Sequence, residues 1–477
     1  MSKRISLLLA ITALLGYHQA ADAAGFALIE QSVSSMGNAY AGGAAVAEDA
    51  STIYFNPAGM TRICNYEFVT GGHIVISKSK FDNDGSIHAS FTDAAKTTHN
   101  SLTGSNGHDA GESALVPHTY FVKNFCNNNF AVGLGINSPF GLATDYGHHW
   151  KGRYHAIRSQ ILTININPAL AYRVNRCWSI GAGLNVMYLH AKLSNAVDYG
   201  LLVDQAIALG AGDPTYPFPH GIFSQALDGR AIVKGNSWGY GGNIGVLWEP
   251  CCGTRFGAHF RSEIKHRVKG SEKFKDTPGI EAAITPIVRA PSAAVIAAGI
   301  AAKLNNTRAK SDVTLPSSFS VSGYHELNDC WAVMGDITWT KWNVLERLRF
   351  RFNNSLQPDS ITVMKWQNNM RYSGGVTYSP WNCWTFRTGL AYDQTPIKNK
   401  KYRTPRLPGE DRFWTALGVG YKWSNCIRFD LGYAHLFIKE PKIDKTHFLT
   451  DDITRGGLKG DYDARTDIVS AQLVWDF

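Results

Sequence analysis

The 477-residue sequence lacks long apolar runs, CxxC pairs and clusters of basic residues. Beyond residue 23 no apolar stretch reaches the length of a transmembrane helix, which excludes a protein that crosses a membrane with helices. Without a CxxC pair, the eight cysteines do not form an ordinary zinc motif. Lys and Arg are scattered, so the net charge of +9 does not indicate a surface for nucleic acid.

Signals for an enzyme are weak. The segment Gly235-Asn236-Ser237-Trp238-Gly239 has the spacing of a nucleophile elbow, but that motif needs a strand-to-helix turn and here it opens a strand. His148, His149 and His155 lie near Asp145 in one loop, but no second cluster completes a metal site. We therefore expect neither enzymatic activity nor a cofactor.

The N-terminus has the organisation of a secretory signal. Two basic residues precede the apolar core Ile5 to Leu15, and Ala21-Asp22-Ala23 is a small-x-small cleavage site. We expect residues 1–23 to be removed, so that the mature chain is exported to an oxidising compartment where disulfides persist.

Cysteines mark the tight turns of the exported chain. Seven short stretches, most of them rich in Asn or Gly, carry them, and each opens a run of alternating residues. The first precedes the strands, and the other six separate seven hairpins. This predicts a barrel of 14 antiparallel strands over residues 66–477. The cysteines are Cys64, Cys126, Cys177, Cys251, Cys252, Cys330, Cys383 and Cys426.

The sequence leaves open whether these cysteines form disulfides. Neighbouring turns of a barrel lie two strands apart, about 10 Å, whereas a disulfide needs Cα atoms within about 7 Å. Pairing therefore requires the turns to lean together. The sequential pairs would be Cys64 with Cys126, Cys177 with Cys251, Cys252 with Cys330 and Cys383 with Cys426; otherwise the thiols are free.

Alternation with period two indicates membrane-spanning strands. After Cys383, one face carries Trp384, Phe386, Leu390 and Tyr392. Most strands are longer than those of a soluble sandwich and carry aromatic residues near their ends, as outer-membrane barrels do. The last segment alternates too and ends on Phe477, which resembles the signal read by the barrel assembly machinery of bacterial outer membranes. A secreted soluble β protein is the less favoured alternative.

Residues 24–65 do not follow the strand pattern. They are small, Gly-rich and apolar, and could form a disordered tail, a periplasmic partner domain or a plug inside the barrel. Their content of Ala, Val, Ile and Phe argues against disorder.

Two long loops are unusually aliphatic. Residues 195–235 carry Leu201 and Leu202 at near-helical spacing, and residues 273–312 are rich in Ile and Val. Apolar surface of this extent usually marks a ligand or partner site. The same residues could pack on each other as a cap, and both can hold together.

Ordered blocks along the whole mature chain carry a resemblance to a known family. The sequence resembles the FadL family of outer-membrane long-chain fatty acid transporters, which also contains TodX-like hydrocarbon channels. The blocks are Ala24-Gly25-Phe26, Gly37-Asn38-Ala39-Tyr40, Asn56-Pro57-Ala58, Phe140-Gly141-Leu142-Ala143-Thr144, Gly152-Arg153-Tyr154-His155-Ala156, Leu315-Pro316, Val321-Ser322-Gly323-Tyr324, Trp384-Thr385-Phe386-Arg387-Thr388-Gly389 and Asp411-Arg412-Phe413-Trp414.

The resemblance implies an all-β transmembrane barrel of 14 strands with an N-terminal hatch inside the lumen and partly helical extracellular loops. It also implies a route: the loops capture a fatty acid or other hydrophobic compound, the ligand moves to an inner pocket, the hatch shifts, and the ligand leaves sideways where the third strand kinks. The chain would then lie in the Gram-negative outer membrane as a monomer, with lipopolysaccharide as its acidic neighbour.

The resemblance assigns roles to particular residues. The kink falls at Ser138, Pro139, Phe140 and Gly141, where proline cannot donate to the strand ladder and glycine weakens it; alternatively Pro139 only ends the strand. The hatch motif Asn56, Pro57 and Ala58 would face the kink, unless it is an ordinary Asn-Pro turn. Phe26 would contact ligand, as would Leu201 and Leu202, which are expected from the aliphatic loop rather than from the resemblance. Arg158 and Arg349 would bind a carboxylate, or be solvated lumen charges.

Three rival functions follow from the same barrel. A channel for aromatic or alkane hydrocarbons would leave the arginines without a role. A general porin needs neither a hatch nor aliphatic loops, and an adhesin would present polar loops. Residues 24–65 and the loops therefore favour a transporter of hydrophobic compounds.

Overall fold

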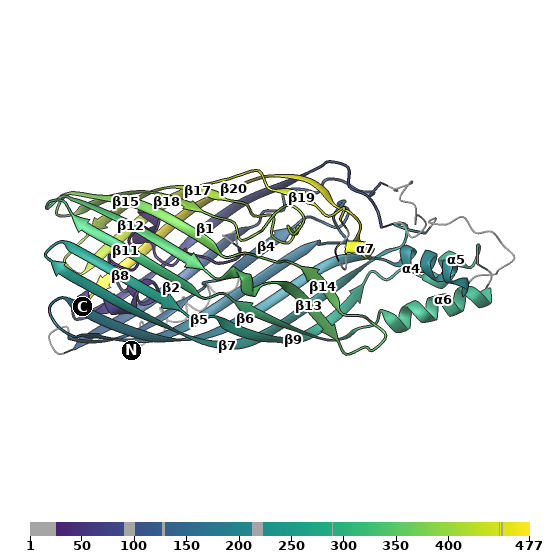
Figure 1. Ribbon diagram of the computed structural model, residues 1–477, viewed down its shortest axis with the longest axis horizontal. Helices are drawn as coiled ribbons and strands as arrows, with labels where there is room; N and C mark the ends of the chain where they lie inside the picture. Colours follow the sequence, from purple (N-terminus) through teal and green to yellow (C-terminus); the bar gives the residue numbers. More distant parts are fainter. Residues whose placement is uncertain are drawn as a thin grey trace, which may run out of the picture.

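The chain folds as a closed antiparallel barrel (Figure 1). The computed structural model describes residues 25–89, 101–125, 129–211, 223–288, 290–447, 449 and 452–477, so the expected signal peptide lies outside the described residues. The barrel closes because β1 (Tyr66–Asn83) pairs with both β2 (Ser113–Phe125) and β20 (Lys459–Asp476). Six of the 20 strand segments continue the preceding one across a break, which leaves 14 positions in the wall. The predicted 14-stranded barrel is confirmed.

The other strands follow chain order around the barrel. The unbroken ones are β5 (Arg158–Arg173), β6 (Trp178–Asp198), β7 (Asp228–Cys251), β16 (Trp384–Asp393) and β17 (Arg412–Lys422). The interrupted ones are β3 (Phe130–Asn137) with β4 (Gly141–Asp145), β8 (Thr254–Arg261) with β9 (Ile264–Lys275), β10 (Thr307–Leu315) with β11 (Ser318–Glu326), β12 (Trp331–Thr340) with β13 (Arg347–Phe352), β14 (Ser360–Val363) with β15 (Asn369–Trp381), and β18 (Ile427–Ile438) with β19 (Lys442–Asp444).

The alternation predicted for the strands places apolar side chains on the outside of the wall. On β16, Phe386, Leu390 and Tyr392 are exposed, whereas Arg387 and Asp393 point inward and are buried. An outer face of this composition suits a lipid environment.

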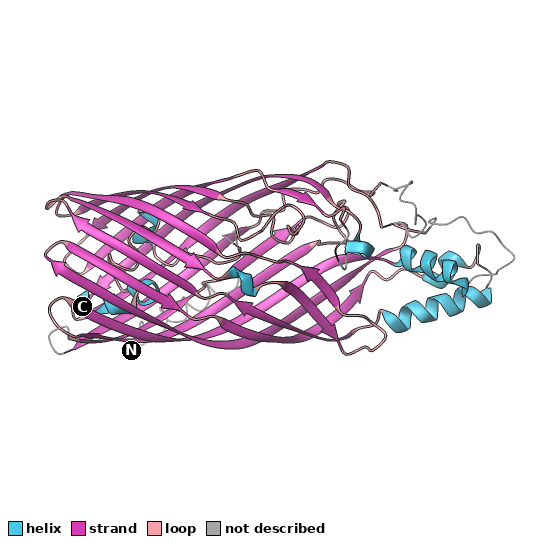
Figure 2. Cartoon of the chain, viewed as in Figure 1, coloured by secondary structure: helices cyan, strands magenta, loops and turns pink. Residues whose placement is uncertain are grey.

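The N-terminal segment lies inside the barrel, near the end that holds the C-terminus (Figure 2). It forms α2 (Val33–Gly37), α3 (Thr52–Phe55) and the 3-10 helix η2 (Pro57–Arg62), whose side chains are mostly buried against the strands. Two carboxylates fix it to the wall: Glu48 pairs with Arg387, and Asp49 pairs with Arg428 at 3.1 Å.

The opposite end of the barrel carries helices (Figure 1). These are α4 (Tyr199–Ala206), the π-helix η3 (Ile207–Ala211), α5 (Ile280–Ile284), α6 (Ala290–Lys303) and, near α4, α7 (Asp452–Arg455). The short 3-10 helix η4 (Trp342–Val344) lies between β12 and β13. Tyr199, Val203, Ile284, Ile296 and Ile300 share one apolar cluster, so the two aliphatic loops pack together as a cap. Among the described residues, no helix is both long and apolar enough to span a membrane.

The sequential disulfides considered above are not formed between described cysteines. Cys64, Cys177, Cys251, Cys252, Cys330, Cys383 and Cys426 are all free, and Cys126 lies outside the described residues. The pairs Cys177 with Cys251, Cys252 with Cys330 and Cys383 with Cys426 are therefore wrong. Turns two strands apart are separated by more than the span of a disulfide.

Candidate functional site

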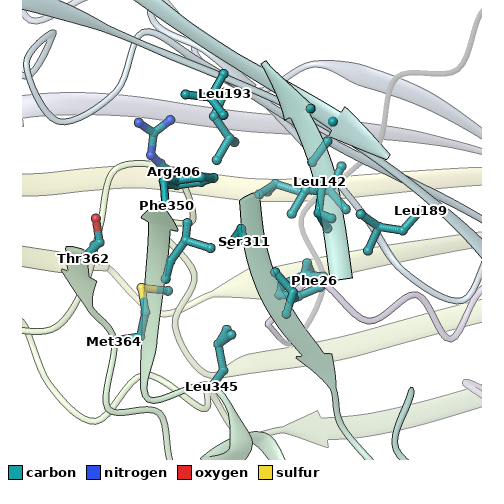
Figure 3. Close-up of a pocket in the computed structure, with 18 of the residues that line it drawn as sticks. Phe26, Leu142, Leu189, Leu193, Ser311, Leu345, Phe350, Thr362, Met364 and Arg406 are labelled. Atoms are coloured by element: carbon teal, nitrogen blue, oxygen red, sulfur yellow. The ribbon is translucent and has the colours of Figure 1, made fainter. Parts of the chain in front are cut away.

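An apolar cavity of about 90 Å³ lies in the lumen above the N-terminal segment. Its walls come from strands on several sides of the barrel and from Phe26 (Figure 3). The apolar lining includes Leu142, Ile161, Leu189, Val268, Val313, Leu345, Phe350, Met364 and Leu407. Such a surface holds an alkyl chain by removing it from water, which contributes about 0.8 kcal/mol per buried CH₂ group.

Three charged residues, Lys234, Lys310 and Arg406, border this cavity. The two lysines are exposed, whereas Arg406 is half-buried at the edge of the cavity, beside Phe350 and away from Phe26 (Figure 3). It belongs to the loop between β16 and β17 and donates to the hydroxyl of Ser159 at 3.1 Å and to the carbonyl of Ser194 at 3.4 Å. No carboxylate of the described residues forms an ion pair with it. Burial, with the nearby Arg455 cation, lowers the pKa of the Arg406 guanidinium to about 9.

A half-buried cation without an acidic partner has lost part of its hydration and gained only neutral hydrogen bonds. A carboxylate supplied by a ligand would restore both charge balance and bidentate hydrogen bonding, which guanidinium geometry favours. Arg406 and the apolar walls together therefore suit an amphipathic anion.

A second, outer cavity of about 250 Å³ adjoins the first on the side of the cap. The two share Leu193, Val233, Phe350 and Arg406 in their walls. Leu201 and Leu202 of α4 line the outer cavity, as do several side chains of β7, β9 and β13. The two aliphatic loops therefore form both a cap and an apolar surface that lines a cavity, as the sequence allowed.

The wall is broken where the sequence predicts a kink. Between β3 and β4, the carbonyl of Pro139 accepts from the amide of Leu28 at 2.8 Å, and the amide of Gly141 donates to the carbonyl of Phe26 at 2.9 Å. Ala27 and Phe140 form an antiparallel bridge. The N-terminal segment thus supplies the strand pairing that the kinked wall lacks, and covers the break from inside.

Phe26 joins the cavity to this break. Its ring lies 5.0 Å from the ring of Trp342, 5.9 Å from Phe140 and 6.0 Å from Trp366. Phe26 and Trp366 also line the apolar cavity. A ligand that fills the cavity therefore touches the residue whose backbone covers the kink.

Arg158 and Arg349 are not among the residues that line either cavity. Arg158 pairs with Glu112 at 3.2 Å and Asp145 at 3.7 Å, and Arg349 pairs with Asp359. On β13 the flanking Leu348 and Phe350 face the apolar cavity, so strand alternation turns Arg349 away from it. Arg406 was missed because its loop gives no periodic signal.

The expectation that Asn56, Pro57 and Ala58 face the kink is wrong. The amide group of Asn56 donates to the carbonyl of Ala44 at 2.6 Å and to that of Val246 on β7 at 2.9 Å. Pro57 and Ala58 pack against Gly181, and Asn56 and Pro57 pack against Gly245, so closely that neither glycine has room for a Cβ atom. The motif binds the N-terminal segment to β6 and β7, and residues 26–31 contact the kink instead.

The residues considered for catalysis do not assemble a site. Ser237 lies within strand β7 rather than at a strand-to-helix turn. His155 is buried against the carbonyl of Gly456, and among the described residues no three His, Cys, Asp or Glu side chains are placed to bind a metal.

A lipid-facing barrel, an internal apolar cavity and a covered break in the wall define an outer-membrane channel for hydrophobic compounds. Comparisons with known proteins agree. Residues 14–477 match the family described as outer membrane protein transport protein (OMPP1/FadL/TodX). The chain belongs to this family, whose members are transport proteins rather than enzymes, and its place is the Gram-negative outer membrane.

Three relatives illustrate the likeness. The long-chain fatty acid transport protein of Escherichia coli O6:H1 is 30% identical over 419 residues, covering 87% of this chain and 86% of the relative. Outer membrane protein P1 of Haemophilus influenzae is 30% identical over 459 residues, covering 94% and 92%. The structure of a Pseudomonas aeruginosa FadL homologue superposes with a TM-score of 0.80 at 25% identity, covering 95% of this chain and all of the other.

Proposed function

We propose that the protein carries long-chain fatty acids across the outer membrane. The observation that supports this choice is Arg406, a half-buried guanidinium that forms no ion pair with a described carboxylate, at the edge of an apolar cavity. A fatty acid matches both parts, because its tail gains about 0.8 kcal/mol per buried CH₂ group and its carboxylate gains about 1.5–3 kcal/mol from charged hydrogen bonds. Relatives named as long-chain fatty acid transport proteins support the same substrate.

The ligand enters through the cap. Leu201 and Leu202 collect the alkyl chain in the outer cavity, and the shared wall around Phe350 lets it advance into the apolar cavity. The head group then stays at Arg406, which borders both cavities, while the tail extends toward Phe26.

Residues 24–65 act as a hatch, and residues 26–31 are its movable part. A tail that displaces the Phe26 ring loosens the backbone bonds from Phe26 and Leu28 to the kink. The break between β3 and β4 then opens, and the ligand leaves sideways into the membrane. Asn56, Pro57 and Ala58 hold the remainder of the hatch to the wall while this happens.

A hydrocarbon channel is the second candidate. The toluene transporter TbuX of Ralstonia pickettii shares the fold, with a TM-score of 0.59 at 18% identity. A neutral hydrocarbon would contact the apolar walls and form no ion pair with Arg406.

With either substrate, the chain would act as a monomer, surrounded by lipopolysaccharide and inserted by the barrel assembly machinery.

Uptake of labelled oleate and labelled toluene distinguishes the candidates. We expect cells that lack their own transporter and express this chain to take up oleate, and a Leu189→Trp variant, which fills the cavity, to lose that uptake. Leu417→Trp on the exposed outer face is the matched control. Uptake of toluene but not oleate would favour the hydrocarbon channel, and oleate uptake by Leu189→Trp equal to wild type would contradict the route through the cavity.

A further inference from the structure

A third cavity, of about 130 Å³, lies against the kink on the far side of the aromatic cluster around Phe26. Leu28, Pro139, Phe140 and Trp342 form part of its wall. These are the residues of the kink, of its cover and of the aromatic cluster, so the cavity occupies the position between the apolar cavity and the break in the wall.

The polar lining of this cavity carries two arginines and two aspartates. Arg261 of β8 and Arg371 of β15 line the cavity, and each is about nineteen-twentieths buried. Within the described part of the chain neither forms an ion pair. Arg261 donates to Asn185 and to the carbonyl of Tyr54, both uncharged.

Arg371 is the less satisfied of the two cations. Its Nη2 donates to the carbonyl of Ala39 at 2.8 Å, but its Nε and Nη1 are buried without a hydrogen-bond partner among the described residues. Its guanidinium lies 5.3 Å from the Trp414 ring and 5.8 Å from the Tyr40 ring. Buried donors left unpaired in this way are costly, and an anion in the cavity would satisfy them.

The acidic groups nearby leave room for an anion. Asp336, which also lines the cavity, accepts from the hydroxyls of Ser320, Ser322 and Thr338 at 2.6 Å each. Glu30 interacts electrostatically with Arg371. Burial nevertheless raises the pKa of Glu30 to about 7, so this carboxyl is largely protonated at mildly acidic pH. Asp393, which lines the cavity and is the cross-strand neighbour of Arg371, is the carboxyl that competes with a ligand for this arginine.

We propose that this cavity is a second binding site for an amphipathic anion, which places its carboxylate on Arg371 and its alkyl chain along Leu28, Phe140 and Trp342. The inference rests on the proposed function and deepens it, since it makes the cavity the last stage before lateral exit. A ligand held there has its tail at the break in the wall and its head group retained in the lumen.

Native mass spectrometry of the full chain in detergent, titrated with palmitate, tests the proposal. We expect the number of tightly bound palmitates to fall by one in Arg371→Gln, by one in Arg406→Gln and by two in the double variant. Arg349→Gln should keep the wild-type number of bound palmitates, because Arg349 is exposed and lines none of the three cavities. Leu28→Trp, which fills the apolar half and leaves the charges intact, should also lose one and serves if Arg371→Gln does not fold.

Two outcomes separate the claims. A wild-type count in Arg371→Gln or in Leu28→Trp, with one palmitate lost in Arg406→Gln, would overturn the second site and leave the proposed function standing. A wild-type count in Arg406→Gln would overturn the proposed head-group site, whatever Arg371→Gln shows.

Discussion

The amide of Gly141 donates to the carbonyl oxygen of Phe26 at 2.9 Å, and the ring of Phe26 lines the apolar cavity. The backbone of Phe26 thus covers the break in the wall, while its side chain lines the cavity. In the proposed function, this arrangement would link occupation of the cavity to opening of the break between β3 and β4.

Removing the Phe26 ring should loosen the cover. Phe26 is 5% exposed and contacts three aromatic rings, and a buried Phe→Ala change costs about 3–5 kcal/mol. We expect amides of residues 26–31 in Phe26→Ala to exchange with deuterium at least tenfold faster, as measured by mass spectrometry. Phe437→Ala on the exposed outer face is the control, and equal exchange rates in both variants would refute the coupling.

Arg406 should determine selectivity between charged and neutral ligands. Loss of charged hydrogen bonds worth about 1.5–3 kcal/mol predicts that Arg406→Gln binds oleate roughly 10- to 100-fold more weakly. Binding of a neutral alkane of the same length should be unchanged, because the apolar walls are intact. Calorimetric titration checks both values. Equal weakening for the alkane would show that the substitution disturbs the cavity itself.

Glu30 should make docking of residues 26–31 depend on pH. Burial raises the pKa of Glu30 from 4.5 to about 7, so the docked segment binds a proton that the released segment gives up. Docking is therefore strongest below pH 4.5 and weakens as pH rises toward 7, by on the order of 3 kcal/mol if release exposes Glu30 fully.

Deuterium exchange of residues 26–31 should accordingly become faster, relative to the barrel strands, between pH 5 and pH 8 after correction for intrinsic rates. Glu30→Gln should remove this dependence while retaining a buried hydrogen-bonding side chain. A dependence that survives in Glu30→Gln would assign it to another group.

The cysteine turns should be chemically accessible from one side only. Cys64, Cys251, Cys252, Cys383 and Cys426 are free and exposed at the end of the barrel that carries the short turns. A membrane-impermeant maleimide should label them in cells with a permeabilised outer membrane and leave intact cells unlabelled. Resistance to labelling that reductant relieves would indicate disulfides instead.

The barrel could be predicted from local sequence because its signals are local. Strand alternation and the turns around the cysteines recur along the chain, and both are properties of neighbouring residues. The break at Pro139 was visible for the same reason, since proline cannot donate to a ladder wherever it stands.

The site could not be predicted in the same way because it depends on distant contacts. Arg406 faces the cavity only because its loop folds into the lumen against Ser159 and Ser194. Asn56 was assigned to the kink from the family resemblance, but its partner on the wall is Val246, on the strand β7. Which strands a plug touches is decided by closure of the barrel, which no short motif encodes.

Lateral exit is tested most directly by locking residues 26–28 onto the kink. Ala27 and Phe140 form an antiparallel bridge, so cysteines at these two positions would be close enough to cross-link. In a background with the eight native cysteines replaced by serine, we expect the oxidised Ala27→Cys/Phe140→Cys protein to lose oleate uptake and regain it on reduction. Equal uptake by the oxidised and reduced protein would contradict exit through the break between β3 and β4.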